Sequence, residues 1–440
     1  MENKGIERFS AIYLYIVSAI FLLLNSALLQ FIALLLILFL GISYFRYNAL
    51  HPFVWLSFSV FIYNVSFCLL DIFGILRLDY IHEILNCTFI SIVSYFTFFF
   101  LFLRNFSMNY STSFINKDRA RVLYILLFVL GVIMIFYLPL FVRSGYASKK
   151  EMNLDGGLPF FGIISRFYFL IYTLYLTYFC HKYKRIPKNL ILINIIIALG
   201  AALIIGERDV FLTICLLTFF VYYKYFKVSF SKVILFGIVG LISVAVLQTT
   251  KQITNKEKIN LPMENMFLAI FGGEFATSGS NLYVLLSNEK NWNYQYGIAI
   301  KKDLGRAIVP DYISRQENST RWFNQKFNPH LDSGYGMGFS FIGEGYLQFG
   351  YWGVFIWSFL LALLSLILYS NAQKHIYGFV AYIYMISVTF YAMRGDFSYI
   401  ISPLLKQVYL SYLVLLFVFK FVKKNRNELL NIKKSVTNYH

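Results

Sequence analysis

Long apolar runs recur along almost the whole chain. Each is continuous for about 18–23 residues, the length that an α-helix needs to cross a bilayer. None alternates polar and apolar positions as a membrane β-strand does. The pattern predicts an all-α polytopic membrane protein with about twelve transmembrane helices. The predicted spans lie near residues 9–25, 27–45, 52–74, 84–103, 122–142, 158–180, 189–206, 209–226, 231–249, 339–370, 377–393 and 398–421.

One long polar segment interrupts this pattern, between the ninth and tenth predicted spans. Residues 250–338 combine charges, Gly, Asn and Pro with aromatic residues such as Trp292 and Trp322. The aromatic content favours a folded loop over a disordered one. Its part 263–286 has helical apolar spacing and is expected to lie along the membrane surface. The predicted organisation is spans one to nine in 1–249, a large periplasmic loop in 250–338, spans ten to twelve in 339–421 and a basic cytoplasmic tail in 422–440.

Composition and charge support this reading and orient the chain. Hydrophobic residues make up 59% and charged residues 14%, whereas soluble domains have about 45–50% and 25%. If the N-terminus is cytoplasmic, most Lys and Arg residues fall in the predicted inner loops, as the positive-inside rule requires. The net charge of +18 therefore reflects a membrane topology with both termini cytoplasmic, and it needs no nucleic-acid partner to explain it.

Six charged residues lie within or at the edge of the apolar runs, near the predicted outer leaflet. They are Arg166, Arg208, Arg394, Lys406, Asp71 and Glu344. A charge at such a depth is unfavourable and usually has a function or a partner. The cations predict an anion site, since a guanidinium group offers a bidentate fork that matches phosphate oxygens.

Ordinary interfacial ion pairs are the simpler interpretation of the two Arg-containing turns. Arg208 lies between Glu207 and Asp209, and Arg394 lies two residues before Asp396. This alternative stays open for each arginine taken singly. The combination of two turns with two further cations inside the spans favours the anion site.

Metal and nucleotide chemistry find no support in the sequence. No Asp-x-Asp occurs, and no two histidines have helical metal spacing. The glycine-rich stretch 334–338 lacks the preceding strand of a nucleotide loop. The cysteines, Cys68, Cys87, Cys180 and Cys215, all lie in apolar runs and are expected to be small buried hydrophobic residues. No metal and no cofactor is predicted.

A family resemblance is concentrated in residues 338–353. The matching positions are Gly338, Ser340, Glu344, Tyr346, Phe349, Gly350 and Gly353. They follow the order Gly-x-Ser-x-x-x-Glu-x-Tyr-x-x-Phe-Gly-x-x-Gly. This segment resembles the end of the large periplasmic loop in Wzy-type O-antigen polymerases, also called oligosaccharide repeat unit polymerases. Gly206-x-Arg208-x-x-Phe211 is similar to a second turn of that family, and the span count, the late large loop and the Arg-Gly-Asp turn at 394–396 extend the resemblance.

The resemblance implies a metal-independent glycosyltransferase of the bacterial inner membrane that joins glycans carried on undecaprenyl pyrophosphate at the periplasmic side. The expected partners are lipid-linked oligosaccharides, membrane lipid and a chain-length regulator protein. The lipid pyrophosphate would be the leaving group, and Arg208, Arg394, Arg166, Lys406 and Arg321 would bind it. Glu344 is the first choice for the general base, with His330 and Asp332 as second choices.

Three alternatives remain from the sequence. An O-antigen ligase has a similar architecture and leaving group and differs in its acceptor. A lipid-linked oligosaccharide flippase is disfavoured because the large loop falls in one half of the chain only. A scaffold or receptor would not explain the charged positions. For Glu344 itself, a structural ion pair with a nearby arginine is an equal alternative.

Overall fold

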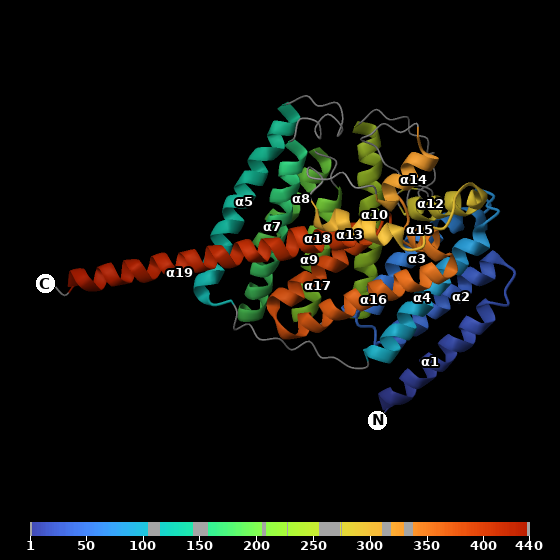
Figure 1. Ribbon diagram of the computed structural model, residues 1–440. Coiled ribbons are helices and arrows are strands. Elements are labelled where there is room, and N and C mark those ends of the chain that lie inside the picture. Colours follow the sequence, from blue (N-terminus) through green and yellow to red (C-terminus); the bar gives the residue numbers. More distant parts are fainter. Residues whose placement is uncertain are drawn as a thin grey trace.

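The computed structural model of the protein is shown in Figure 1. It describes residues 2–103, 115–143, 157–204, 208–226, 228–254, 273, 275–309, 318–329 and 338–437. Every regular element in these ranges is a helix, and none is a strand. The predicted all-α class is therefore confirmed.

The helices follow the apolar runs closely. The first ten elements are α1 (Glu2–Phe21), α2 (Ala27–Tyr44), α3 (Pro52–Ile72), α4 (Ile81–Phe102), α5 (Lys117–Arg143), α7 (Gly157–Tyr183), α8 (Lys188–Ile204), α9 (Arg208–Tyr225), α10 (Phe230–Thr254) and α12 (Ala276–Ser287). The others are η1 (Glu289–Asn291), α13 (Ile298–Ile308), α14 (Ser319–Phe327), α15 (Phe341–Phe349), α16 (Tyr351–Lys374), α17 (Ile376–Ala392), α18 (Ser398–Pro403), η2 (Leu404–Tyr409) and α19 (Leu410–Thr437).

Seven helical stretches in the described residues are long and apolar enough to cross a bilayer. They are Ala27–Tyr44, Pro52–Ile72, Ile81–Phe102, Lys117–Leu138, Gly162–Tyr183, Tyr351–Lys374 and Ser398–Lys423. Four shorter apolar helices occupy further predicted spans: Phe9–Phe21, Lys188–Ile204, Phe230–Gly240 and Ile376–Ala392. A multi-pass membrane protein follows from these helices, while the number of twelve spans stays a prediction.

Helix α3 forms the centre of the bundle. It is apolar all round and buried along most of its length, as a helix surrounded by other helices is. Polar contacts connect it to the last third of the chain, because the Trp55 indole donates to the Tyr382 hydroxyl of α17 at 2.9 Å. Helices α2, α5 and α19 lie at the periphery and keep many apolar side chains exposed. That exposure fits contact with lipid.

The predicted single span at 339–370 is wrong. The helix breaks at Gly350, whose φ of +61° is a conformation that L side chains rarely adopt. The chain then turns back, so α15 packs on α16. A Cβ atom on Gly353 would lie 1.9 Å from the Gly345 carbonyl oxygen. The sequence pattern did not reveal this hairpin, because the turn depends on glycine and not on a run of polar residues.

The expected surface helix at 263–286 is described in part. Its first part lies outside the described residues, and its second part is α12. The face of α12 that carries Ser278, Asn281 and Leu282 is buried against α3, α4 and α15. Packing on these helices accounts for the apolar spacing of α12, and its position along a membrane surface stays a prediction.

The last predicted span contains an irregular turn. Pro403 interrupts the helix, and the six residues of η2 that follow are π-helical. Proline lacks the N–H that an α-helix needs at this point, and π-turns inside helices are frequent at functional sites. After this turn α19 continues to Thr437, so the described part of the basic tail is helical, and it extends well beyond the other helices (Figure 1).

Candidate catalytic and anion-binding site

Three buried carboxyl groups from distant parts of the chain lie together. Asp303 comes from α13, Glu344 from α15 and Asp396 from the turn between α17 and α18, and none is more than 1% exposed. Electrostatic interaction couples Asp303 and Glu344 to each other and each of them to Asp396. The cluster thus joins the large-loop helices to the membrane helices.

Glu344 accepts hydrogen bonds on both of its oxygens. Its Oε2 atom accepts from the Trp357 indole at 3.0 Å and from the Phe397 backbone N–H at 2.8 Å. Its Oε1 atom accepts from the Ser319 hydroxyl at 2.9 Å. Indole and backbone N–H groups only donate. Glu344 is therefore held as an acceptor, and it connects α14, α16 and the α17–α18 turn.

Asp303 and Glu344 form a pair of closely spaced carboxyl groups. Burial raises the pKa of Asp303, and the neighbouring Glu344 charge raises it further. Burial also raises the pKa of Glu344, whereas hydrogen bonding with Asp303 opposes that shift. Two carboxyl groups this close cannot both ionise at low cost. Ionisation of one member therefore makes ionisation of the other less favourable.

The first turn of α14 binds Asp396. The Thr320 backbone N–H donates to Asp396 Oδ2 at 3.1 Å, and the Asn318 side-chain amide donates to the same atom. The Ser398 backbone N–H and hydroxyl donate to Oδ1. The positive end of the helix dipole favours an anion there. Within the described residues, no group of three His, Cys, Asp or Glu side chains is arranged to hold a metal ion.

Two arginines stack on neighbouring tyrosines beside this cluster. The Arg306 guanidinium lies over the Tyr399 ring, 5.8 Å from its centroid. The Arg394 guanidinium lies over the Tyr391 ring, 5.1 Å from its centroid. The charges of both arginines interact with the Tyr399 hydroxyl, so the two stacked pairs lie in one region. Stacking on a ring stabilises a guanidinium and fixes the direction of its plane.

The family-like segment holds the Arg394 turn directly. The Phe339 N–H donates to the Arg394 carbonyl at 2.8 Å, and the Phe341 N–H donates to the Met393 carbonyl at 3.1 Å. Ser340 caps α15 by accepting from the Gly343 N–H at 3.1 Å. The two stretches that the sequence singled out separately, 338–353 and 394–396, are therefore one structural unit.

Lys406 and Arg166 bind protein groups on either side of η2. The Lys406 ammonium donates to the carbonyls of Arg306 and Val309 at 3.0 and 3.3 Å, and so caps the C-terminus of α13. With the Gln407 amide turned so that its nitrogen faces the Tyr384 hydroxyl, its oxygen accepts from Arg166 Nη1 at 2.8 Å and Nε at 3.1 Å. Lys406 and Arg166, which were both predicted to bind an anion, thus bind neighbouring groups of the protein in this structure.

The structure describes the remaining predicted residues in part. Arg208 begins α9, but its side chain lies outside the described residues, as do His330 and Asp332 altogether. Arg321 is exposed in the first turn of α14, next to the acid cluster. Asp71 accepts from the Leu78 N–H at 2.8 Å, which is a local turn contact. Of the predicted cations, Arg394 therefore lies beside the Glu344 cluster, with Arg321 on α14 close by.

Sequence reasoning missed Asp303 and Arg306, both on α13. One signal was present: Asp303 shares a helical face with Ile300 and Ala307, so a carboxyl group stands on the apolar side of an amphipathic helix. Such a residue is buried only with a partner. The partner could not be named, because α13 and α15 meet only in the folded chain.

Comparison with known protein families identifies the family of this chain. A sequence model of the family described as O-antigen polysaccharide polymerase Wzy matches residues 6–426, nearly the whole chain. The chain belongs to the Wzy O-antigen polysaccharide polymerase family. No curated protein and no solved structure matches it. Membership in the Wzy family supports the role of an O-antigen polymerase, a polymerising glycosyltransferase that acts on lipid-linked oligosaccharide repeat units.

Proposed function

We propose that this chain polymerises undecaprenyl-pyrophosphate-linked repeat units at the periplasmic face of the inner membrane. The observation that carries the proposal is the pair of ring-stacked arginines, Arg306 on Tyr399 and Arg394 on Tyr391, beside the segment that resembles the family pattern. Two guanidinium groups suit a pyrophosphate, which presents several oxygens at once. Arg208, Arg166, Lys406 and Arg321 are proposed to extend this cationic region.

The reaction needs stabilisation at two points. A sugar that leaves pyrophosphate passes through an oxocarbenium-like state, as in glycoside hydrolysis, and the arginines would stabilise the charge on the leaving group. The incoming sugar hydroxyl needs a general base. Glu344 is the proposed base, because two N–H groups hold it as a hydrogen-bond acceptor and burial raises its pKa towards the range of a general base.

Access to Glu344 would run through its Oε1 atom. Oε2 is occupied by two N–H donors, whereas Oε1 accepts from the Ser319 hydroxyl at the start of α14. Glu344 is fully buried, so a displacement of α14 would have to precede proton transfer. His330 and Asp332 follow α14 in the chain and are the alternative bases.

The function is tested by the envelope glycan of a deletion strain, separated on a gel. We expect the ladder of O-antigen lengths to collapse to single repeat units, and a plasmid copy of the gene to restore the ladder. Loss of all glycan from its lipid anchor would instead indicate a ligase or a flippase and would contradict the proposal.

The proposed orientation is tested by reporter fusions. Lys290 lies in the large loop, and Lys184 lies in the turn between α7 and α8. A phosphatase that folds only in the periplasm is expected to be active when fused after Lys290 and inactive after Lys184. The activity of both fusions in whole cells gives the answer, and activity at Lys184 alone would reverse the orientation and exclude a periplasmic site.

A further inference from the structure

A groove lined by aromatic side chains lies at the C-terminal end of α15. It has a volume of about 770 Å³ and is lined by Tyr294, Tyr296, Tyr346, Phe349, Gly350, Tyr351, Trp352 and Ile356. The Tyr296 and Trp352 side chains are 70% and 73% exposed. Several aromatic faces that stay open in one groove suit flat apolar faces of a ligand.

The groove also has a polar edge. The hydroxyls of Tyr294 and Tyr346 donate to the same Glu289 oxygen at 2.7 and 3.1 Å. These contacts fix both rings and hold a carboxylate next to them. A ligand in this groove therefore meets aromatic faces and a hydrogen-bond acceptor together.

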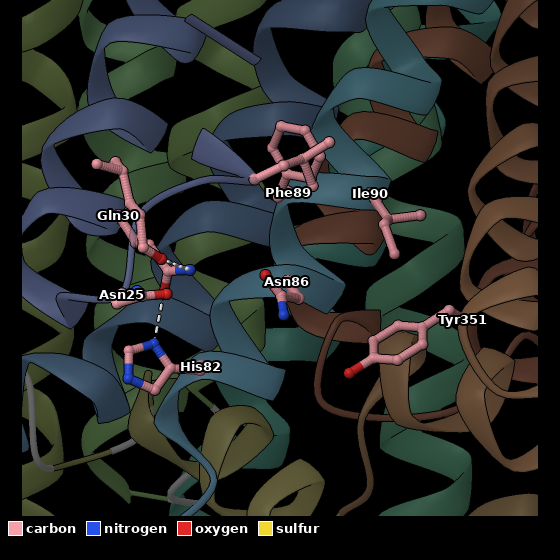
Figure 2. A pocket seen from close by; sticks show the side chains of 9 residues that line it. Asn25, Gln30, His82, Asn86, Phe89, Ile90 and Tyr351 are labelled. Atoms are coloured by element: carbon pink, nitrogen blue, oxygen red, sulfur yellow. Dashed lines mark hydrogen bonds between the residues drawn. The ribbon is translucent and has the colours of Figure 1, made fainter. Parts of the chain in front are cut away.

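A second cavity adjoins the groove through Tyr351. It has a volume of about 510 Å³ and lies among the α1–α2 turn, α4 and the start of α16. Figure 2 shows the side chains of Asn25, Gln30, His82 and Asn86 around it, with Tyr351 on one side. His82 and Gln30 hydrogen-bond at 2.8 Å. Amides, imidazole and phenol together can donate and accept in several directions.

Neither set of lining residues contains Lys or Arg. This separates both cavities from the cationic region around Arg394 and makes them poor sites for a phosphate headgroup. Aromatic faces with neutral donors and acceptors instead match a molecule that has hydroxyl groups on its edges and C–H groups on its faces.

The backbone of Tyr296 is strained in a way that presents its ring. Its φ of +45° is uncommon for a residue with a side chain. Hydrogen bonds hold the turn, because the Gln295 and Tyr296 N–H groups donate to the Leu347 and Gln348 carbonyls at 3.0 and 3.2 Å. The positive φ at this position disfavours a residue with a side chain, and yet the residue found there is Tyr296, whose ring is exposed.

We propose that the aromatic groove and the amide cavity, which meet at Tyr351, together bind the uncharged sugars of the glycan. This inference rests on the proposed function and names where its polymer lies. Helix α15 connects the two regions: its N-terminal end contacts the Arg394 turn, and its C-terminal end lines the groove. Its nine residues span about 13 Å. A lipid-linked glycan would thus place its pyrophosphate at one end of α15 and its sugars at the other.

The test is binding of lipid-free polysaccharide, released by mild acid from the lipopolysaccharide of the source strain. Isothermal titration calorimetry on the full chain in nanodiscs measures it without turnover. Replacing Tyr296 with glycine removes the ring and suits the backbone, so the Tyr296→Gly variant should fold and bind at least about tenfold more weakly, which is about 1.4 kcal/mol. Should it fail to fold, Tyr296→Asn is used, since Asn tolerates positive φ.

The matched control is Tyr47→Gly. Tyr47 also has a positive φ, of +53°, and lies between α2 and α3 at the predicted inner side. The control should bind the polysaccharide as the unchanged chain does. Equal binding by the unchanged chain and the Tyr296→Gly variant would overturn the proposal, as would equal losses in both glycine variants.

Failure of this proposal is distinguishable from failure of the proposed function. If the polysaccharide does not bind but deletion of the gene still collapses the O-antigen ladder, the glycan-binding proposal is wrong and the polymerase proposal stands. If binding depends on Tyr296 but deletion leaves the ladder unchanged, the glycan-binding proposal stands and the polymerase proposal is wrong.

Discussion

The Glu344→Gln variant is expected to polymerise about 10²–10⁴-fold more slowly while it accumulates in the membrane. Glutamine has the shape of glutamate, and its side-chain oxygen can still accept from the Trp357 indole and the Phe397 N–H. Its side-chain nitrogen can donate to Asp303, so the cluster stays hydrogen-bonded. The variant therefore loses basicity but not the fold. Glycan length in the complemented deletion strain and protein level by immunoblot give the two readouts.

The alanine variant of the same residue separates a catalytic from a structural role. Glu344→Ala leaves the indole N–H of Trp357 and the backbone N–H of Phe397 without their acceptor. Each unpaired buried donor costs about 1–3 kcal/mol, so little folded protein is expected. A Gln variant that polymerises at the normal rate would show that the base lies elsewhere, and His330→Ala and Asp332→Ala would then be measured.

The Arg394→Lys variant is expected to lose most of its activity although the charge is kept. A lysine ammonium is a point charge that cannot bind two pyrophosphate oxygens in one plane or stack on Tyr391 as a guanidinium does. Binding of lipid-free polysaccharide should be unchanged, because neither the aromatic groove nor the amide cavity is lined by Lys or Arg. Polymerisation of lipid-linked repeat units by purified protein provides the measurement.

Arg185→Lys is the matched control for this substitution. Arg185 also stacks on a tyrosine, with its guanidinium 5.7 Å from the Tyr183 ring centroid, but it lies in the turn between α7 and α8 at the predicted inner side. Its lysine variant should keep full activity. Normal polymerisation by Arg394→Lys, at a normal protein level, would leave the proposed pyrophosphate site without support.

The positions of the helices could be predicted because apolar runs of membrane length leave little choice of structure. The hairpin at Gly350 could not, because residues 339–370 are apolar on both sides of the turn. Only the φ of that glycine and the close approach of Gly345 and Gly353 distinguish two packed helices from one. Both are properties of the folded chain.

The sequence could predict some charged residues of the candidate site, but not the residues that they contact. Glu344 and Arg394 were recognised as charges at the ends of apolar segments. The partners of Glu344 are Ser319, Trp357 and Phe397, which are neutral groups that hydropathy does not distinguish. Asp303 and Arg306 lie on a helix of the large loop, and only its packing against α18 brings them to the site. Contacts between distant segments therefore account for most of what was missed.

The π-turn at Leu404–Tyr409 fixes the rotational register of the last span. Lys406 points from it to the end of α13, and Gln407, the next residue, binds Arg166 of α7. Loss of Leu404 or Leu405 would rotate both side chains together by about 100° about the helix axis, relative to α18. A chain shortened in this way would still have a span of sufficient length, yet α13 and α7 would no longer share a common support. Natural length variation within this turn should therefore be selected against more strongly than variation in the hydrophobicity of the same helix.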